Sequence, residues 1–397
     1  MDQHLFYLPQ HRLGPLLGIG VQHAFRGSDP LQIEQLQTFL DEFQGSYIFG
    51  ALSYELKNHF EALSSLNKDQ LDFPHFHFWV PTALYKLDEQ IALIWGEDSP
   101  SNLKAAQYFW QQLHGPKPGF SADFKERTQK EVYFERFAQV KNALQRGDIY
   151  ELNYCQEFYA EDLRIENPVG LFSKLHELTR APHAAFVQTP DHYVFCASPE
   201  RYLLKDGQTL RSEPIKGTAP RSENPSEDQG FADQLKNDPK ERAENIMIVD
   251  LVRNDLSQLA QKGSVKVEEL CEIYSFETVH QMISKISCQL KPGVNFTDIL
   301  RCSFPMGSMT GAPKIAAMQH IEQIEDFQRG LYSGSIGLIE PNSDFDFNVV
   351  IRSLIYNRKN NYLSCAVGSA ITIEAEPEKE YQECLLKANK LIHGLQS

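Results

Sequence analysis

Residues 330–373 read GLYSGSIGLIEPNSDFDFNVVIRSLIYNRKNNYLSCAVGSAITI, and this stretch decides the fold class. Its β-branched and aromatic runs predict strands at Ser335–Ile339, Val349–Ile355 and Tyr362–Val367, with short turns between them. Strands joined by short turns pair antiparallel, because a parallel pair needs a long crossover connection. A similar run at Tyr193–Ala197 predicts a further strand. We therefore predict an α+β fold of antiparallel or mixed sheets with helices packed outside them.

Composition places the chain among ordinary globular proteins and excludes one class of partner. The chain has 397 residues, 42% of them hydrophobic, which suffices for about two domains or for one large interleaved core. Lys and Arg number 38 against 53 Asp and Glu, so the net charge is −15. This acidic balance argues against a nucleic-acid partner, which would require a basic face. An anionic ligand would need local cations or a bound metal ion to outweigh the protein's own field.

Targeting and redox signals indicate a cytoplasmic protein. No run of about 18 apolar residues is present, so we predict no transmembrane helix and no membrane partner. The opening residues MDQHLFYLPQ lack the pattern of a signal peptide. Seven scattered cysteines without a CxxC pair argue against zinc clusters and disulfides, and they fit a reducing compartment.

The chain divides into three regions. Residues 1–98 mix short strand-like runs with one helical stretch at Gln32–Phe43. Residues 99–127 are rich in Gly, Pro and Ser and read as a connecting region around one helix. Residues 128–395 alternate well-delimited helices with strands. The glycine fingerprints of dinucleotide and ATP sites are absent from all three regions.

Two pairs of glutamates suggest a metal site. Glu241 and Glu244 are three residues apart on a helix predicted to begin near Pro239, and they face the same way as its apolar side. Glu380 and Glu383 repeat the spacing near the C-terminus, where they flank the apolar stripe and by themselves favour a solvated face. Four carboxylates from two helices without a matching His or Cys suit a hard ion such as Mg²⁺.

A glycine-rich loop at Phe304–Lys314 precedes a helix predicted over Ile315–Phe327. Ser308 or Thr310 could cap this helix, and its N-terminus could bind an anion. An ordinary loop before a helix is an equal alternative.

Two further residues could carry chemistry. Lys216 lies between two prolines and could act as a nucleophile if burial lowered its pKa, although an exposed loop lysine is the commoner case. Glu200 follows a strand and could be a general acid, or a turn carboxylate paired with Arg201.

From about Thr128 to Leu395 the chain resembles the chorismate-utilising enzymes, a family that comprises anthranilate synthase component I, aminodeoxychorismate synthase component I, and the isochorismate and salicylate synthases. Eight segments carry the resemblance in the family's order: GDIYELNY, SPERYLL, PIKGTAPR, ERAENIMIVDLVRNDLS, FPMGSMTGAPKIAAM, GLYSGSIGLIEP, DFNVVIRSL and EYQECLLKANK. In the N-terminal third only Phe49–Lys57 matches. The resemblance implies a single intertwined α+β domain of layered, mainly antiparallel sheets ringed by helices.

The same resemblance implies a site for chorismate and Mg²⁺. Glu244 and Glu383 fall on the family's metal-ligand positions, and Glu241 and Glu380 lie close behind them. Positions that hold the substrate's carboxylates match Tyr332, Arg352 and the backbone around Thr310 and Gly368.

Within the family, Lys216 indicates the aminodeoxychorismate branch, which reads PIKGT where anthranilate synthases read PIAGT. In that branch the lysine attacks ring C2, the glutamate at Glu200 protonates the leaving C4 hydroxyl, and ammonia then displaces the lysine. The chain shows no glutaminase triad, so ammonia is expected from a separate glutamine amidotransferase subunit. It also shows no lyase domain for the later elimination of pyruvate.

Departures from the family pattern keep two alternatives open. Gln281 stands where the family usually has histidine, which weakens any role inferred for that position. The alternatives are anthranilate synthase component I, against which Lys216 speaks, and a catalytically silent subunit that docks the amidotransferase. Isochorismate and salicylate synthases have a lysine where this chain has Glu151. The tryptophan motif of feedback-inhibited relatives is not recognisable, so we predict no tryptophan binding.

Overall fold

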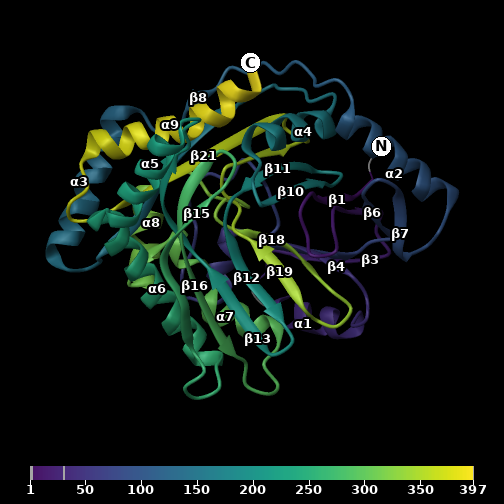
Figure 1. Cartoon of the computed structure of the whole chain (residues 1–397), viewed down its shortest axis with the longest axis horizontal. Coiled ribbons are helices and arrows are strands. Elements are labelled where there is room, and N and C mark those ends of the chain that lie inside the picture. The colour runs from purple at the N-terminus through teal and green to yellow at the C-terminus, as the bar shows by residue number, and fades with distance from the viewer. Residues whose placement is uncertain (1–2, 30–31, 397) are drawn as a thin grey trace.

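The computed structural model describes residues 3–29 and 32–396. Its strands form two large sheets in which successive neighbours pair antiparallel. Helices cover the outer surfaces (Figure 1). The α+β prediction is confirmed.

Sheet A contains, in spatial order, β17 (Gly311–Ala312), β9 (Glu151–Ala160), β21 (Tyr362–Ile371), β20 (Ser353–Asn357), β11 (His192–Ser198), β10 (His183–Gln188), β1 (Leu5–Leu8), β2 (Leu16–Ile19), β6 (Ala83–Leu87) and β7 (Ile91–Gly96), with β8 (Lys125–Glu126) paired to β9. Sheet B contains β14 (Ile215–Pro220), β16 (Val279–Gln289), β13 (Thr209–Glu213), β12 (Arg201–Asp206), β19 (Phe345–Asn348), β18 (Ser335–Ile339), β4 (Ile48–Leu52), β5 (Phe76–Val80) and β3 (His23–Gly27), with β15 (Lys266–Ser275) paired to β16. The helices are α1 (Ile33–Glu42), α2 (Pro100–His114), α3 (Lys130–Arg146), α4 (Pro168–Thr179), α5 (Pro225–Asn237), α6 (Pro239–Leu259), α7 (Phe296–Ser303), α8 (Lys314–Ile324) and α9 (Pro377–Gln396), with short 3-10 turns η2 (Tyr54–His59) and η3 (Gly307–Met309).

The main core lies between the two sheets. Successive side chains of a strand point to opposite faces. In β1, Phe6 faces sheet B and stacks on Phe49 with 4.1 Å between ring centroids. Its neighbour Tyr7 faces the other way and packs on Phe109 of α2 and Phe172 of α4. Because both faces of sheet A are covered, its central strands are buried nearly throughout, as β9 and β21 show.

One strand prediction was wrong in an informative way. The run Val349–Ile355 is not one strand: β19 ends at Asn348 in sheet B, and β20 begins at Ser353 in sheet A. The intervening residues cross from one sheet to the other, and Arg352 takes a left-handed backbone conformation (φ 53°) at the crossing. Hydrophobicity alone could not reveal this crossing, because Val349 and Val350 are as buried as strand residues.

Helix positions agree with the sequence, except at α8. Asp238 caps α6 by accepting hydrogen bonds from the backbone N–H groups of Lys240 (2.9 Å) and Glu241 (3.0 Å), so the helix begins at Pro239 as predicted. The predicted cap of α8 by Ser308 or Thr310 is wrong, because this helix begins after Pro313 without a side-chain cap. It also ends at Ile324, three residues before the predicted end.

The N-terminal third contributes to both sheets. In sheet A, β1 pairs with β10, and in sheet B, β4 pairs with β18. Helices α3, α5, α6, α8 and α9 gather on one side of the sheets, on the left in Figure 1. No helix among the described residues is long and apolar enough to cross a lipid bilayer.

Candidate functional site

A cavity of about 580 Å³ lies where β14, β16, β21, α6 and α9 meet the loop between α7 and α8 (residues 304–313, the η3 loop). That size suits a small-molecule ligand. Nine of the ten predicted site residues line it: Glu200, Lys216, Glu241, Glu244, Tyr332, Arg352, Gly368, Glu380 and Glu383. Thr310 is fully buried and does not line the cavity, although its neighbours Ser308 and Met309 do. Thr310 instead donates from its hydroxyl to the Met306 carbonyl (3.1 Å), which stabilises the loop.

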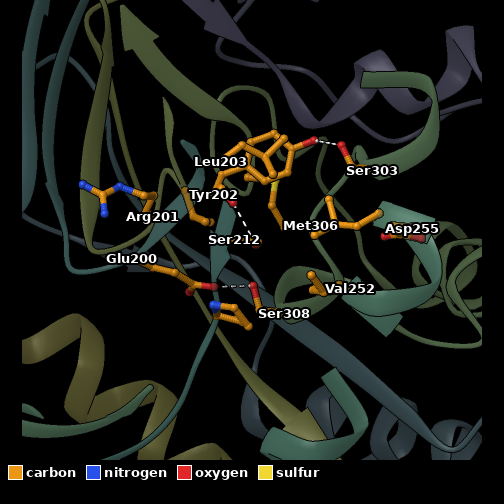
Figure 2. Close-up of a pocket in the computed structure, with 14 residues that line it drawn as sticks. Glu200, Arg201, Tyr202, Leu203, Ser212, Val252, Asp255, Ser303, Met306 and Ser308 are labelled. Carbon is orange, nitrogen blue, oxygen red and sulfur yellow. Dashed lines mark hydrogen bonds between the residues drawn. The ribbon is translucent and has the colours of Figure 1, made fainter. Parts of the chain in front are cut away.

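Glu200 is buried beside the η3 loop (Figure 2). The Ser308 hydroxyl donates to Glu200 Oε1 at 2.7 Å. Burial raises the pKa of Glu200 to about 7, against the opposing effects of Ser308 and Lys216. The alternative of a pair with Arg201 is wrong, because Arg201 bonds to Glu213 (2.9 Å) and Asp346 (2.9 Å) instead. A carboxyl group with a pKa near neutrality is suited to general-acid work.

Lys216 lies at the start of β14 with its side chain only 11% exposed, so the exposed-loop alternative is wrong. Its ammonium donates to Glu151 Oε1 at 2.7 Å. Burial by itself would lower the pKa of Lys216, but the nearby carboxylates of Glu151 and Glu244 outweigh it and raise this pKa. The condition set from the sequence, a lowered pKa, is therefore not met in this state of the site.

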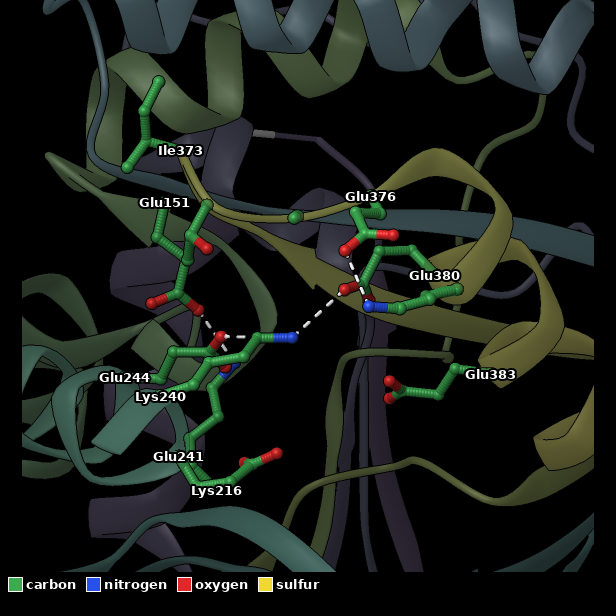
Figure 3. A network of polar contacts seen from close by, with 12 residues as sticks. Glu151, Lys216, Lys240, Glu241, Glu244, Ile373, Glu376, Glu380 and Glu383 are labelled. Carbon is green, nitrogen blue, oxygen red and sulfur yellow. Dashed lines mark hydrogen bonds and ion pairs between the residues drawn. The ribbon is translucent and has the colours of Figure 1, made fainter. Parts of the chain in front are cut away.

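The four predicted carboxylates face the cavity from α6 and α9 (Figure 3). Lys240 lies between two of them, 3.2 Å from Glu380 and 3.9 Å from Glu244. Lys387 lies 2.5 Å from Glu383. The expectation of a solvated face at Glu380 is wrong, because Glu380 is only 3% exposed.

These carboxylates have the donor chemistry for a hard cation. Glu244 Oε1 is buried and has no hydrogen-bond partner in the described part of the chain, and burial raises the pKa of Glu244 to about 7. A buried carboxylate in this condition requires a proton or a cation. Within residues 3–29 and 32–396, no three acidic, His or Cys side chains converge closely enough to hold a metal as placed. All-oxygen donors around an unpartnered oxygen nevertheless fit Mg²⁺.

The cavity also carries a cation that can bind anions. The Arg352 guanidinium lines the cavity, and among the described residues it has no ion-pair partner. Burial lowers its pKa, so this cation would gain from an anionic ligand. Gly368 of β21, which lines the same cavity, lies close to strand β9, because a Cβ at this position would lie 2.7 Å from Cys155 Sγ.

Several residues of the site carried no clear signal in the sequence. Glu151, Ser308, Lys240 and Lys387 acquire their roles only from contacts across elements. Gln281, noted as a departure, is buried against the cavity, and its Oε1 has no hydrogen-bond partner among the residues that the structure describes.

Comparisons with known proteins show the family of the chain. A family model described as chorismate binding enzyme matches residues 9–393. Aminodeoxychorismate synthase component 1 of Escherichia coli is 35% identical over 93% of this chain and 83% of that protein. The protein of the same name from Bacillus subtilis is 30% identical over 95% of this chain and 84% of its own length.

Solved structures share the fold at lower identity. Anthranilate synthase component I from Streptococcus pneumoniae superposes with a TM-score of 0.80 at 24% identity, covering 95% of this chain and 91% of that one. The menaquinone-specific isochorismate synthase MenF from Escherichia coli gives 0.76 at 19% identity, covering 99% and 89%. Fold and sequence thus lead to one conclusion: the chain belongs to the family of chorismate binding enzymes.

Proposed function

We propose that this chain aminates chorismate at ring C4 to give 4-amino-4-deoxychorismate, the precursor of 4-aminobenzoate and folate. One observation carries the proposal: Lys216 and Glu200 line the same cavity as the carboxylate cluster and Arg352. The names of the relatives from Escherichia coli and Bacillus subtilis support the same activity.

The proposed chemistry proceeds through a covalent lysine adduct. Neutral Lys216 attacks ring C2 while Glu200 protonates the C4 hydroxyl, which leaves as water. Hydroxide is a poor leaving group, so this step needs an acid. Ammonia then attacks C4 and the C2–nitrogen bond breaks, which returns Lys216 as an amine. Two displacements in sequence place the new amine at the position that the hydroxyl held.

The remaining residues would bind and orient the substrate. Arg352 and Tyr332 hold its carboxylates, together with the backbone near Thr310 and Gly368. Glu244 and Glu383 would hold Mg²⁺, supported by Glu241 and Glu380. The ion would neutralise the ring carboxylate and fix the ring in place. Lys240 and Lys387 would have to release Glu380 and Glu383 for this.

Ammonia is proposed to come from a separate glutamine amidotransferase subunit. The designation component 1 of the relatives supports a second component.

A product assay with a lysine variant tests the proposal. The purified chain is incubated with chorismate, Mg²⁺ and excess ammonium near pH 8.5, with and without a chelator, and products are identified by mass and fluorescence. We expect aminodeoxychorismate from the wild type, and a loss of at least about 100-fold in Lys216→Ala. Lys379→Ala removes an exposed lysine outside the cavity and is the matched control.

Other products would redirect the assignment. Fluorescent anthranilate, or full activity in Lys216→Ala, would contradict the lysine mechanism. If ammonium supports no turnover, the assay is repeated with glutamine and the amidotransferase subunit. Continued inactivity in that assay would favour the silent docking subunit.

A further inference from the structure

The mechanism proposed above requires a neutral Lys216, yet in the structure this lysine forms an ion pair with a buried carboxylate, which favours its ammonium form. Its Nζ donates to Glu151 Oε1 at 2.7 Å, and the Glu151 side chain is 1% exposed. An ammonium has no lone pair with which to attack carbon. A neighbouring group, or solvent, must therefore accept its proton before the attack.

The Glu151 carboxylate meets the amine end of Lys216 (Figure 3), and Glu151 is not among the residues that line the cavity. Its second carboxylate oxygen, Oε2, is buried and has no hydrogen-bond partner among the described residues. This carboxylate therefore touches the reacting nitrogen and does not line the space where substrate would bind. Its contact with Nζ lies within the distance range for direct proton transfer.

The backbone of Glu151 is fixed by the η3 loop. In sheet A, Glu151 pairs with Ala312 of β17. The flanking residues are bonded to the same loop: Tyr150 N–H donates to Ala312 O (2.7 Å), and Asn153 N–H donates to Thr310 O (2.8 Å). Gly311 approaches so closely that a Cβ there would lie 2.1 Å from the Glu151 carbonyl oxygen. The carboxylate is thus built into a rigid position.

Other charged groups also lie near this pair and interact with it electrostatically. They are Glu200 before β12, Lys240, Glu241 and Glu244 on α6, and Glu383 on α9. Glu200 is already assigned as the acid for the leaving hydroxyl, and the others line the cavity. Glu151 differs from these groups in two respects: its carboxylate is hydrogen-bonded to Nζ, and it lies outside the cavity.

We propose that Glu151 is the proton acceptor that converts Lys216 into a nucleophile, an inference that rests on the proposed function. The proton moves from Nζ to the Glu151 carboxylate, leaving a neutral amine and a neutral carboxyl group. The amine forms the bond to ring C2 as the C4–oxygen bond breaks, and the hydroxyl leaves as water with the proton of Glu200. The nitrogen is then a secondary ammonium bound to the ring.

The second half of the cycle restores every proton. Ammonia bonds to C4, and the C2–nitrogen electron pair returns to Lys216 as a neutral amine. The new C4 ammonium gives one proton to the Glu200 carboxylate. Glu151 returns its proton to Lys216, which recreates the ion pair. The sum is chorismate plus ammonia giving aminodeoxychorismate plus water.

The pH dependence of adduct formation tests the role of Glu151. Wild-type enzyme and Glu151→Gln are mixed with chorismate and Mg²⁺ without ammonia, and the lysine adduct is quantified over time by intact mass, as chorismate less one water. In the wild type the proton stays within the pair, so Lys216 adds no rise in rate with pH. In Glu151→Gln the proton must go to solvent, so the ratio of variant to wild-type rates should rise about tenfold per pH unit from pH 6.5 to 8.5. At pH 7 the variant should be at least about 100-fold slower.

Controls separate this proposal from a structural role and from the proposed function. Glu157→Gln removes another buried carboxylate of β9, paired with Arg127 outside the cavity, and its ratio to wild type should stay flat with pH. Glu151→Asp keeps a carboxylate and should also give a flat ratio. A flat ratio in Glu151→Gln would overturn the proposal.

Two outcomes keep the test decisive if Glu151→Gln does not fold. Because Glu200 must be protonated, the wild-type rate should fall above about pH 7; a wild-type rate that instead stays level from there to pH 8.5 would show that solvent takes the proton and would overturn the role of Glu151. No adduct in the wild type would refute the lysine mechanism of the proposed function, whatever Glu151 does. A wild-type adduct with a flat Glu151→Gln ratio would leave the proposed function standing and remove only this inference.

Discussion

Two carboxyl groups beside Lys216 have different environments, and that difference assigns them different tasks. Glu200 is buried with one hydroxyl partner, and its pKa rises to about 7. Glu151 is held in an ion pair with the lysine. A carboxyl group with a raised pKa and a second one hydrogen-bonded to the amine are the two groups that the proposed displacement needs.

Replacing Glu200 by Gln should abolish the acid step. The amide cannot donate its proton to a leaving hydroxyl, so we expect kcat to fall by about 10²- to 10⁴-fold. Because Glu200 must be protonated to act, the wild-type rate should fall as pH rises above about 7. The variant should not show this decline. The measurement is kcat against pH at a fixed concentration of free ammonia. Glu213→Gln changes a carboxylate outside the cavity and is the control; its rate should decline above about pH 7 as in the wild type.

The same substitution should change stability with a defined sign. The folded pKa of Glu200 lies above its ordinary value of 4.5, so folding stability is lost as pH rises from about 4.5 through about 7. Glu200→Gln should therefore be more stable than the wild type at pH 8, by up to about 3 kcal/mol, and much less so at pH 4.5. Urea unfolding at both pH values checks this, and an equal difference at the two would contradict it.

At the scale of elements, the η3 loop connects the two catalytic candidates. Ser308 of this loop bonds to Glu200, while Gly311 and Ala312 pair with the strand that carries Glu151. Buried Arg329 stabilises the loop: it donates to the Met309 carbonyl (2.7 Å) and forms an ion pair with buried Glu325 (2.6 Å). A shift of this loop would move the acid and the proton acceptor together.

Gly311→Ala tests that connection. Gly311 has φ +145°, and an added Cβ would collide with the Glu151 carbonyl oxygen, so the loop must move. We expect a loss of roughly 1–3 kcal/mol in stability and slower adduct formation. Gly230→Ala in α5, where a Cβ meets nothing within 4 Å, is the control and should stabilise by about 0.5–1 kcal/mol. Unchanged melting and adduct rate in Gly311→Ala would contradict the connection.

At the scale of the whole molecule, the N-terminal third is part of the same folding unit as the site. Strand β1 lies between β10 and β2, and β4 lies between β18 and β5, so residues 1–98 complete both sheets. Their aromatic side chains fill the space between the sheets, as Phe49 and Trp79 do. The regions proposed from composition are then segments of one intertwined core.

Expression of residues 99–397 alone tests this cooperativity. Removing residues 1–98 exposes the edges of β10 and β18 and opens the central core, so we expect a fragment without a cooperative thermal transition, prone to aggregation. The intact chain should unfold in urea as one transition by both fluorescence and circular dichroism. A soluble fragment with a sharp melt would contradict a single unit.

The sequence by itself determined the class of fold, most elements and the chemistry of the cavity wall. Local periodicity and capping residues set α6, β18 and β21, because those signals depend on neighbours in the chain. The sequence motifs predicted nine of the residues that line the cavity in the folded chain. These are properties that side-chain type and spacing carry without tertiary contacts.

Tertiary structure decided what spacing cannot encode. The crossing at Val349–Arg352, the burial of Glu380 and the exclusion of Thr310 from the cavity depend on packing between distant segments. The same is true of the Glu151–Lys216 pair, whose members lie 65 residues apart in the chain. A pKa is set by desolvation and by charges within a few ångströms, so the state of Lys216 could be judged only after the fold had brought Glu151 and Glu244 beside it.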